Sequence, residues 1–326
     1  MNLATEYLGM TLPNPIVIGA SPLSDDLDSV RRLEDAGASA IVLRSLFEEQ
    51  ITREQMAEYV YLDGHGESFA EARTFFPNAN AFALGPDAYL RHLRKVKHAV
   101  RIPVIASLNG STPGGWLSFA KLIEDAGADG LELHIFHAAS DMTMSASDVE
   151  RHFVQIVTEV KRAVRIPIAV KLAPLFTAFS HFAGQLDAAD ADGIVVFTRF
   201  SKADIDVKEL EIVRSMPLSD SGDLLMRLRG AAALSGRVKA SIAITGGVHT
   251  GLDVIKATMA GAHATQMVSA LLRHGPNHIR RVLGEIKAWM QEHEWESLGE
   301  MRGNMSLGKI PDPAAYERAN FRMALR

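Results

Sequence analysis

Apolar and polar positions follow one another along the chain in a recurring two-part pattern. A segment with apolar residues at helical spacing ends in Ala-Gly-Ala or a close variant, and a short apolar run follows at once, as at 35–43, 125–133, 187–196 and 259–267. The 3.6-residue period predicts an amphipathic helix, and the short apolar run predicts a buried parallel strand. The chain is therefore built from repeated strand and helix units.

Eight such units fit the sequence. We expect strands at 16–20, 40–44, 103–108, 130–135, 167–172, 192–197, 241–245 and 264–268, and helices near 26–36, 86–99, 115–126, 147–163, 176–189, 224–236, 250–260 and 276–294. In AVRIPVIASL (99–108) and AVRIPIAVKL (163–172) a proline separates the end of a helix from the next strand. Eight alternations of strand and helix predict an α/β fold, the (β/α)8 TIM barrel.

The organisation of domains follows from the absence of any Pro/Gly/Ser-rich linker. We expect one barrel domain over 1–296, and a C-terminal extension over 297–326 that packs on the barrel or in an oligomer interface. Two insertions exceed the usual loop length, 45–85 after the second strand and 198–223 after the sixth. Both follow the carboxyl ends of strands, where barrels build active sites, so we expect them to form walls or lids of a substrate site.

Composition narrows the function. The 326 residues are 47% hydrophobic and 22% charged, which suits a folded domain with a sizeable core. A net charge of −5 without a basic run argues against nucleic acid or an anionic membrane as partner, and favours a small-molecule substrate. The chain has no cysteine, which excludes an iron–sulfur cluster, a thiolate metal site and a cysteine nucleophile. No signal peptide or membrane span is visible in the pattern, so we expect a cytoplasmic protein.

A candidate phosphate site lies near the end of the predicted barrel. Gly246-Gly247 follows the seventh strand, and Ser269 begins a helix after the eighth. Loops at these two places commonly bind phosphate through backbone N–H groups, with added attraction from the helix N-terminus. The alternative is a simple tight turn at the two glycines.

The sequence resembles the FMN-dependent dihydroorotate dehydrogenases and the related dihydropyrimidine dehydrogenases over about residues 10–295. The segments that carry the resemblance are NPIVIGASP (14–22), AGASAIVLRS (36–45), PVIASLNG (103–110), GADGLELH (127–134), IPIAVKLAP (166–174) and TGGVHTGLDVIKATMAGAHATQMVSALLRHGP (245–276). The resemblance implies FMN on top of the barrel, a homodimer and a role in pyrimidine metabolism. The residues that it assigns to FMN are Ala20 and Ser21 against the ring, Arg44, Asn109 and Lys171 near it, and Gly246, Gly247, Val248, Val268 and Ser269 at the phosphate.

The position of Lys171 in the sequence also suggests a role independently of the resemblance. A lysine within the apolar strand IAVKLA is costly to bury without an anionic partner, so we expect it to face a ligand. A cation beside the pyrimidine edge of a flavin would stabilise the anionic reduced ring. The alternative is a structural ion pair with Glu132 on the neighbouring strand, and both can hold together.

The segment after the fourth strand departs from the family. Where dihydroorotate dehydrogenases have Asn-Leu-Ser-Cys-Pro-Asn, this chain has Glu132-Leu133-His134-Ile135-Phe136-His137. The position of the family's base, a Cys or Ser, falls on Ile135, and Glu132 and His137 replace asparagines that bind substrate amides. Arg44 stands in the second strand where the family has a lysine.

These departures suggest a different proton-transfer group. Side chains two apart on a strand share a face, so Glu132 and His134 form a candidate acid/base pair, with His137 as the second candidate base. Hydrogen-bonded packing is the alternative for each histidine. Arg44 and Arg199, just past strand ends, are candidates to bind a substrate carboxylate, or else form ion pairs.

We therefore predict an FMN-dependent oxidoreductase that moves a hydride between flavin N5 and a C–C unit of a small carboxylate or amide substrate, with dihydroorotate as one candidate. One alternative is an accessory FMN- or phosphate-binding barrel that acts in a partner complex. Another is a flavin-free barrel that binds phosphorylated metabolites. We expect no metal site, and an external electron-transfer partner would have to bring its own iron–sulfur cluster.

Overall fold

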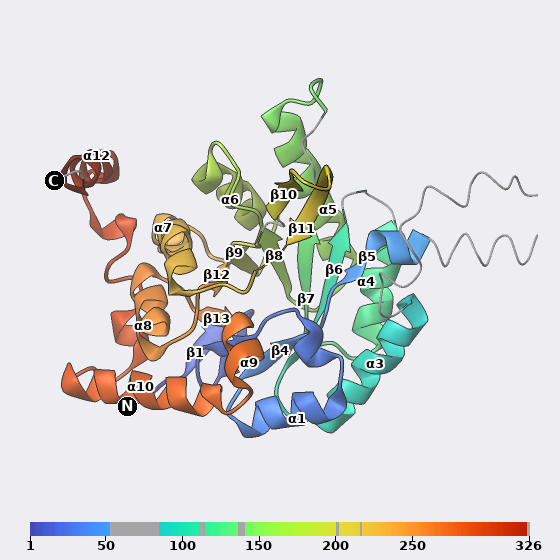
Figure 1. The fold of residues 1–326 in the computed structure, drawn as a ribbon, viewed down its shortest axis with the longest axis horizontal. Coiled ribbons are helices and arrows are strands. Elements are labelled where there is room, and N and C mark those ends of the chain that lie inside the picture. Colours follow the sequence, from blue (N-terminus) through green and yellow to red (C-terminus); the bar gives the residue numbers. More distant parts are fainter. Residues whose placement is uncertain are drawn as a thin grey trace, which may run out of the picture.

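The computed structural model describes residues 1–52, 85–110, 112, 115–135, 141–199, 202–215 and 217–324 (Figure 1). Eight parallel strands form a closed barrel, because each strand pairs with the next, β13 pairs with β3, and β4 pairs with β6. The strands are β3 (Ile16–Ile18), β4 (Ala40–Val42), β6 (Val104–Gly110), β7 (Gly130–Ile135), β8 (Ile168–Leu172), β9 (Gly193–Val196), β12 (Ser241–Thr245) and β13 (Ala264–Met267). Seven lie within the predicted segments and β6 extends two residues beyond 103–108, and the predicted TIM barrel is confirmed.

Helices surround the barrel on its outside (Figure 1). They are α1 (Leu27–Asp35), α3 (Pro86–Ala99), α4 (Gly115–Asp125), α5 (Ala146–Ala163), α6 (Phe179–Ala188), α7 (Leu224–Leu234), α8 (Gly251–Ala260) and α10 (His278–Glu292). The recurring glycine of the Ala-Gly-Ala phrase ends helices by adopting a left-handed conformation, as Gly261 does after α8 with φ 117°. The phrase is thus a repeated helix stop that turns the chain into the next strand.

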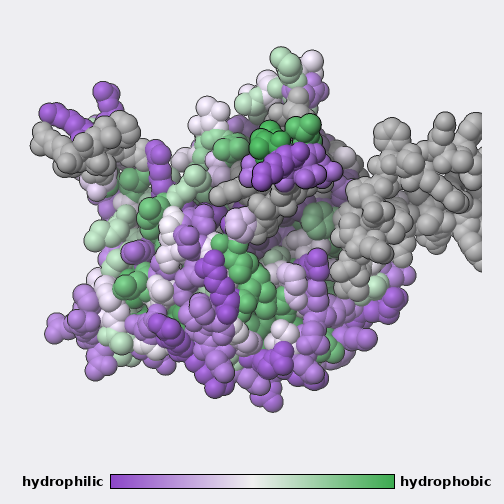
Figure 2. Space-filling view, in the orientation of Figure 1, coloured by the Kyte–Doolittle hydropathy of each residue, from purple (hydrophilic) through white to green (hydrophobic). Residues whose placement is uncertain are grey.

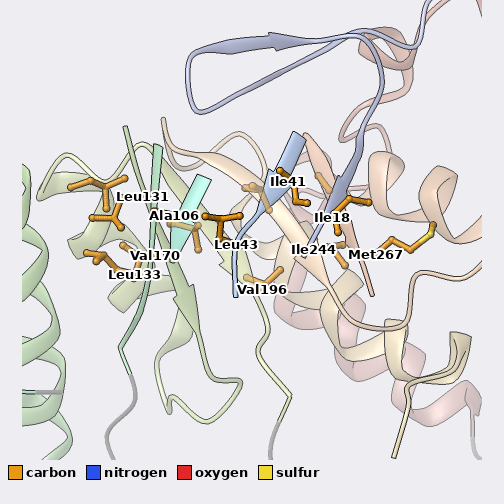
Figure 3. Packing of buried hydrophobic residues seen from close by; sticks show 14 of the residues in the cluster. Ile18, Ile41, Leu43, Ala106, Leu131, Leu133, Val170, Val196, Ile244 and Met267 are labelled. Carbon is orange, nitrogen blue, oxygen red and sulfur yellow. The ribbon is translucent and has the colours of Figure 1, made fainter. Parts of the chain in front are cut away.

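The larger core lies between the strands and the helices. Outward side chains from all eight strands belong to it, and Figure 3 shows members such as Ile18, Leu133, Val170 and Met267. They pack with the apolar stripes of the helices, for example with Phe182 of α6, which is completely buried. Alternate residues of the same strands point into the barrel instead, as the period of two requires.

The lower half of the barrel interior is filled by an N-terminal hairpin that the sequence did not predict. Strands β1 (Thr5–Tyr7) and β2 (Met10–Leu12) pair antiparallel, and the turn residue Leu8 enters the barrel from the amino-terminal end of the strands. A Cβ on Gly193 would lie 2.6 Å from Leu8 Cδ2, so only glycine fits there. Inward alanines at 40, 169, 243 and 264 leave room for Tyr7, Leu8 and Leu12. The barrel is thus closed at its amino-terminal end.

Two long connections follow the second and sixth barrel strands, β4 and β9. Of the predicted insertion 45–85, the structure describes 45–52, including β5 (Leu46–Phe47), and residue 85, while 53–84 lie outside the described residues. The insertion after β9 contains the antiparallel hairpin of β10 (Lys202–Asp206) and β11 (Glu211–Ser215). Figure 2 shows apolar side chains on this hairpin, where Ile205 and Leu210 are exposed.

The chain after β13 contains more elements than the one predicted helix. A short helix, α9 (Ser269–His274), precedes α10, and α11 (Leu298–Met301), a 3-10 turn η5 (Leu307–Lys309) and α12 (Pro313–Ala324) follow it. Leu298 and Met301 are buried, and Gly303 N–H donates to Thr258 O of α8 at 3.0 Å. In Figure 1, α12 stands away from the barrel. Within the described part of the chain, no helix has the length and apolar character needed to cross a membrane.

Candidate functional site

A polar cluster lies inside the barrel above the hairpin. Glu132 of β7, Lys171 of β8 and Gln266 of β13 are 1%, 8% and 1% exposed. Lys171 Nζ donates to Glu132 Oε1 at 2.9 Å and to Gln266 Oε1 at 3.2 Å, and Gln266 Nε2 donates to the other carboxylate oxygen, Oε2. We call these three residues the barrel triad. The ion pair between Lys171 and Glu132, given above as the alternative role of the lysine, is present.

The triad satisfies each buried charge at least once. The carboxylate accepts one hydrogen bond on each oxygen, and two of the three Lys171 N–H groups have partners. Exclusion of water strengthens the attraction between the two charges, but removing both charges from water costs a comparable free energy. The net contribution of the pair to the stability of the fold is therefore small, although the two side chains hold each other in place. Among the described residues these are the two acceptors of Lys171 Nζ, so one of its three N–H groups is left for a further partner.

A row of three side chains crosses neighbouring strands at the level of the lysine. Asn109 of β6 is in register with His134 of β7, which is in register with Lys171 of β8. Asn109 Nδ2 lies 2.9 Å from His134 Nδ1, so the amide donates to that ring nitrogen when the imidazole proton is on Nε2. Three of the sequence-predicted residues are therefore neighbours.

The charge of His134 depends on this environment. Burial, and secondarily the positive charge of Lys171, lower the pKa of the imidazole to about 4, although Glu132 acts in the opposite direction. His134 is therefore neutral at pH 7. Protonating it costs about 3 kcal/mol more than protonating an ordinary histidine, which makes it a weak base in the protein alone.

A tyrosine from the hairpin approaches the triad from below. Tyr7 is 1% exposed, and burial together with the Glu132 carboxylate raises the pKa of its hydroxyl well above the ordinary value. Among the described residues, no hydrogen-bond partner is found for its Oη atom. The phenol thus remains neutral beneath the carboxylate, and sequence reasoning missed it because the hairpin itself was missed.

The predicted phosphate site forms a second cluster at the carboxyl end of the barrel. Gly246 and Gly247 adopt φ values of 85° and 82°, and a Cβ on Gly247 would lie 2.4 Å from the backbone nitrogen of Leu224. Gly247 N–H donates to Ser219 Oγ at 3.3 Å, and Ser219 N–H donates to Ser269 Oγ at 3.0 Å. We call Gly246, Gly247, Ser219 and Ser269 the anion cup.

The two clusters belong to the same end of the barrel. Gln266 of the triad and Ser269 of the cup are three residues apart, so their Cα atoms are separated by at most about 11 Å. Val268, between Gln266 and Ser269 in the sequence, packs against Gly19, because a Cβ on Gly19 would lie 2.9 Å from Val268 Cγ2. Ala20 and Ser21 follow Gly19 directly, so the strand ends that were expected to hold one ligand do lie together.

Arg227 of α7 was not predicted and is buried beside the cup. It is 7% exposed, and its guanidinium donates to the carbonyl oxygens of Thr245, Asp223 and Phe197. A Cβ on Gly246 would lie 3.0 Å from its Nε and Nη2 atoms. The segment LLMRLRGAAAL has two arginines, Arg227 and Arg229, and its sequence alone did not show that Arg227 is the buried one.

The remaining predicted residues have the following places. Arg44 is half-exposed, and its Nη1 pairs with Asp25 Oδ2 at 2.8 Å, which is the ion-pair alternative. Ser21 Oγ donates to Gly19 O at 2.9 Å, Val248 is buried, and Arg199 is half-buried. His137 lies outside the described residues. No group of three or more described His, Asp or Glu side chains is placed to hold a metal ion.

Comparison with known proteins assigns this barrel. Residues 2–290 match the sequence model of the family named dihydroorotate dehydrogenase. The chain belongs to the dihydroorotate dehydrogenase family. The family resemblance expected from the motifs is thereby confirmed.

The relatives are distant in sequence, and the two dihydroorotate dehydrogenases among them align over nearly their whole length. The catalytic subunit of dihydroorotate dehydrogenase B (NAD(+)) of Methanothermobacter thermautotrophicus is 26% identical over 310 residues, which cover 92% of this chain and 97% of the relative. A putative dihydroorotate dehydrogenase A (fumarate) of Aeropyrum pernix is 24% identical over 307 residues, covering 92% and 96%. The chloroplastic dihydropyrimidine dehydrogenase (NADP(+)) of Arabidopsis thaliana is 20% identical over 330 residues, covering 93% and 76%.

Proposed function

We propose that this protein is an FMN-dependent oxidoreductase that transfers a hydride between flavin N5 and a C–C unit of a small carboxylate or amide substrate. Dihydroorotate is the first substrate to test. The observation that supports this most is Lys171, a lysine buried inside a barrel of the dihydroorotate dehydrogenase family and held there by Glu132 and Gln266.

The residues present fit FMN, the cofactor that dihydroorotate dehydrogenases typically bind. The anion cup offers backbone N–H groups at two glycines that leave no space for a side chain, and a serine hydroxyl at the start of α9. The Ser219 oxygen already accepts from Gly247 N–H, as a phosphate oxygen would. We assign the phosphate to Gly246, Gly247, Val248, Val268 and Ser269, and the ring to Ala20, Ser21, Asn109 and Lys171.

When bound, FMN supplies the hydride acceptor and donor. The part of Lys171 is to place a positive charge beside the pyrimidine edge, where reduction adds negative charge. Glu132 partly offsets that charge, and Gln266 fixes the direction of both groups through one hydrogen bond to each. The closed amino-terminal end of the barrel keeps water from reaching them from below.

Proton transfer is assigned to His134. Its ring is oriented by Asn109, and Glu132 supplies the negative charge that favours its protonated form. A substrate carboxylate beside the ring would add to that effect and would raise the pKa of the imidazole from about 4. We keep His137 as the second candidate base.

A second candidate function is an accessory FMN- or phosphate-binding barrel. Two observations favour it. Ile135 stands where the family has its base and is 1% exposed, and the pKa of His134 of about 4 makes this histidine a weak base. In that case the protein would bind its ligand and act through a partner complex without turning over a substrate.

Partners belong to the proposal as well. We propose a homodimer, with electrons passed to an external partner. The names of several relatives describe a catalytic subunit of an NAD(+)-dependent enzyme, which implies another subunit there. Because this chain has no cysteine, an iron–sulfur cluster would have to reside in the partner.

The test is an absorption spectrum of the purified protein, followed by anaerobic addition of dihydroorotate. We expect oxidised flavin bands that bleach with substrate. Flavin bands that persist with dihydroorotate and with related carboxylates and amides would favour the accessory barrel. Protein that is colourless and takes up no added FMN would contradict the proposal.

Two variants then assign the roles. Lys171→Ala is expected to weaken FMN binding or lower the flavin reduction potential. His134→Ala is expected to slow anaerobic bleaching about 100-fold or more, while His181→Ala, an exposed histidine on α6, serves as the control. Equal bleaching rates in both histidine variants would remove His134 as the base.

A further inference from the structure

The positive charge of Arg227 has no full explanation in the fold. All three hydrogen bonds of its guanidinium go to backbone carbonyl oxygens, which could equally be satisfied by a neutral donor. No carboxylate lies within ion-pair distance of it in the described portion of the chain. Burying a charged group without a counter-ion is costly, so the site calls for an anion.

The carboxylates of the turns around 220–223 and 249–253 accept hydrogen bonds within those turns. Asp253 Oδ2 accepts from Ser221 Oγ and from the backbone N–H groups of His249 and Thr250. Asp223 Oδ2 accepts from Asp220 N–H at 3.2 Å as part of a helix cap. These carboxylates stabilise local turns, and only the more distant field of Asp223 compensates the guanidinium.

A second cation adds to the imbalance. Arg199, half-buried just after β9, lies close enough for its charge to act on Arg227. Burial lowers the pKa of the Arg227 guanidinium, Asp223 opposes that shift and Arg199 adds to it. An anion beside Arg227 would offset the effect of both positive charges, and a guanidinium is well suited to bind a phosphate.

The position of Arg227 identifies the anion's place. Its guanidinium lies directly behind Gly246, whose Cβ, if present, would touch it at 3.0 Å, and its Nε donates to the carbonyl of the preceding residue, Thr245. The cup's own donors, Gly247 N–H and the hydroxyls of Ser219 and Ser269, are neutral. None of these donors carries a formal positive charge to balance a dianionic phosphate monoester, whereas the guanidinium of Arg227 does.

We infer that Arg227 supplies the positive charge of the anion cup and makes the protein select a phosphorylated flavin over the same flavin without its phosphate. This inference rests on the proposed function for the identity of the ligand, FMN. Arg227 acts from behind the turn, through its charge and by fixing the carbonyls of the two strand ends. It is a binding residue for the phosphate end and takes no part in hydride transfer.

The experiment compares FMN with riboflavin, which lacks the phosphate. Affinities are measured by quenching of flavin fluorescence on titration with flavin-free protein, for the wild type, Arg227→Gln, Arg227→Lys and the control Arg229→Gln, an exposed arginine on the same helix. We expect Arg227→Gln to weaken FMN binding about 10- to 100-fold and to leave riboflavin binding within a factor of about three. Arg227→Lys, which keeps the charge, should retain most of the preference for FMN.

Other outcomes overturn the inference. If Arg227→Gln weakens both flavins equally, the arginine serves only the fold. If it changes neither, the cup does not depend on its charge. If Arg227→Gln does not fold, the test uses Arg227→Lys and the wild type. A wild type that binds riboflavin as tightly as FMN contradicts the inference, and so does a folded Arg227→Lys variant that binds the two flavins equally.

Inorganic phosphate separates this inference from the proposed function. If the wild type binds neither flavin, the proposed function fails, and the thermal midpoint is then measured with and without phosphate. A rise in the wild type and in Arg229→Gln that is absent in Arg227→Gln would retain Arg227 as the charge of the cup. No rise in the wild type would overturn it too.

Discussion

Removing Lys171 from the barrel triad should destabilise the protein far more than removing a lysine from its surface. In Lys171→Met the Glu132 carboxylate, 1% exposed, keeps only the hydrogen bond from Gln266. Breaking a buried ion pair by deleting one partner typically costs about 3–5 kcal/mol, because a buried charge is left uncompensated. We expect a loss of that size in the free energy of unfolding, measured by urea titration followed by circular dichroism.

Two further variants isolate the cause. Lys171→Met combined with Glu132→Gln removes the orphaned charge, so it should recover at least half of the loss. Lys97→Met breaks the pair with Asp129, whose members are 29% and 32% exposed, and should cost at most about 1 kcal/mol. A double variant as unstable as Lys171→Met alone would refute the reasoning, because the loss would then come from packing.

The remaining predictions concern other parts of the barrel. Burial and the charge of Arg302 lower the pKa of His263 to about 4. The stability that depends on its neutral form is therefore present above pH 6.5, and about 3 kcal/mol of it is lost as the pH falls to 4. His263→Asn, which can still accept from Ile242 N–H, should reduce the dependence of the urea midpoint on pH over this range. Gly193→Ala should cost about 1–3 kcal/mol through its clash with Leu8, and Leu8→Ala in the same chain should relieve part of that loss. Gly184→Ala, within α6 and free of neighbours within 4 Å, should instead raise the thermal midpoint.

The barrel could be predicted because its signals are local. Each strand is a short apolar run fixed by its own glycine or proline, and each helix end carries its own stop, such as Gly261 with its left-handed backbone. The N-terminal hairpin lacked such a signal. Its strands are only three residues long. The space that Leu8 fills exists because Gly193, 185 positions away, has no side chain.

The site could be predicted only in part for the same reason. The shared face of Glu132 and His134 follows from strand periodicity, and the Glu132–Lys171 pair follows from neighbouring strands. Gln266 was missed because it reaches both residues from the last strand, 134 positions after Glu132. Arg227 was missed because only the closed barrel brings α7 against the turn at Gly246.

The N-terminal hairpin of β1 and β2 also affects how the chain folds during synthesis. Leu8 N–H donates to Ser241 Oγ, Thr5 Oγ1 donates to His263 O, and Arg302 Nη2 donates to Thr5 Oγ1. During synthesis residues 1–12 therefore stay unpaired, with Tyr7, Leu8 and Leu12 exposed, until the 290 residues up to Arg302 have left the ribosome. Contacts of such long range form slowly, and exposed apolar residues favour aggregation meanwhile. The closure of the barrel at its amino-terminal end is thus a late event in biogenesis, because the hairpin leaves the ribosome long before the residues that it contacts.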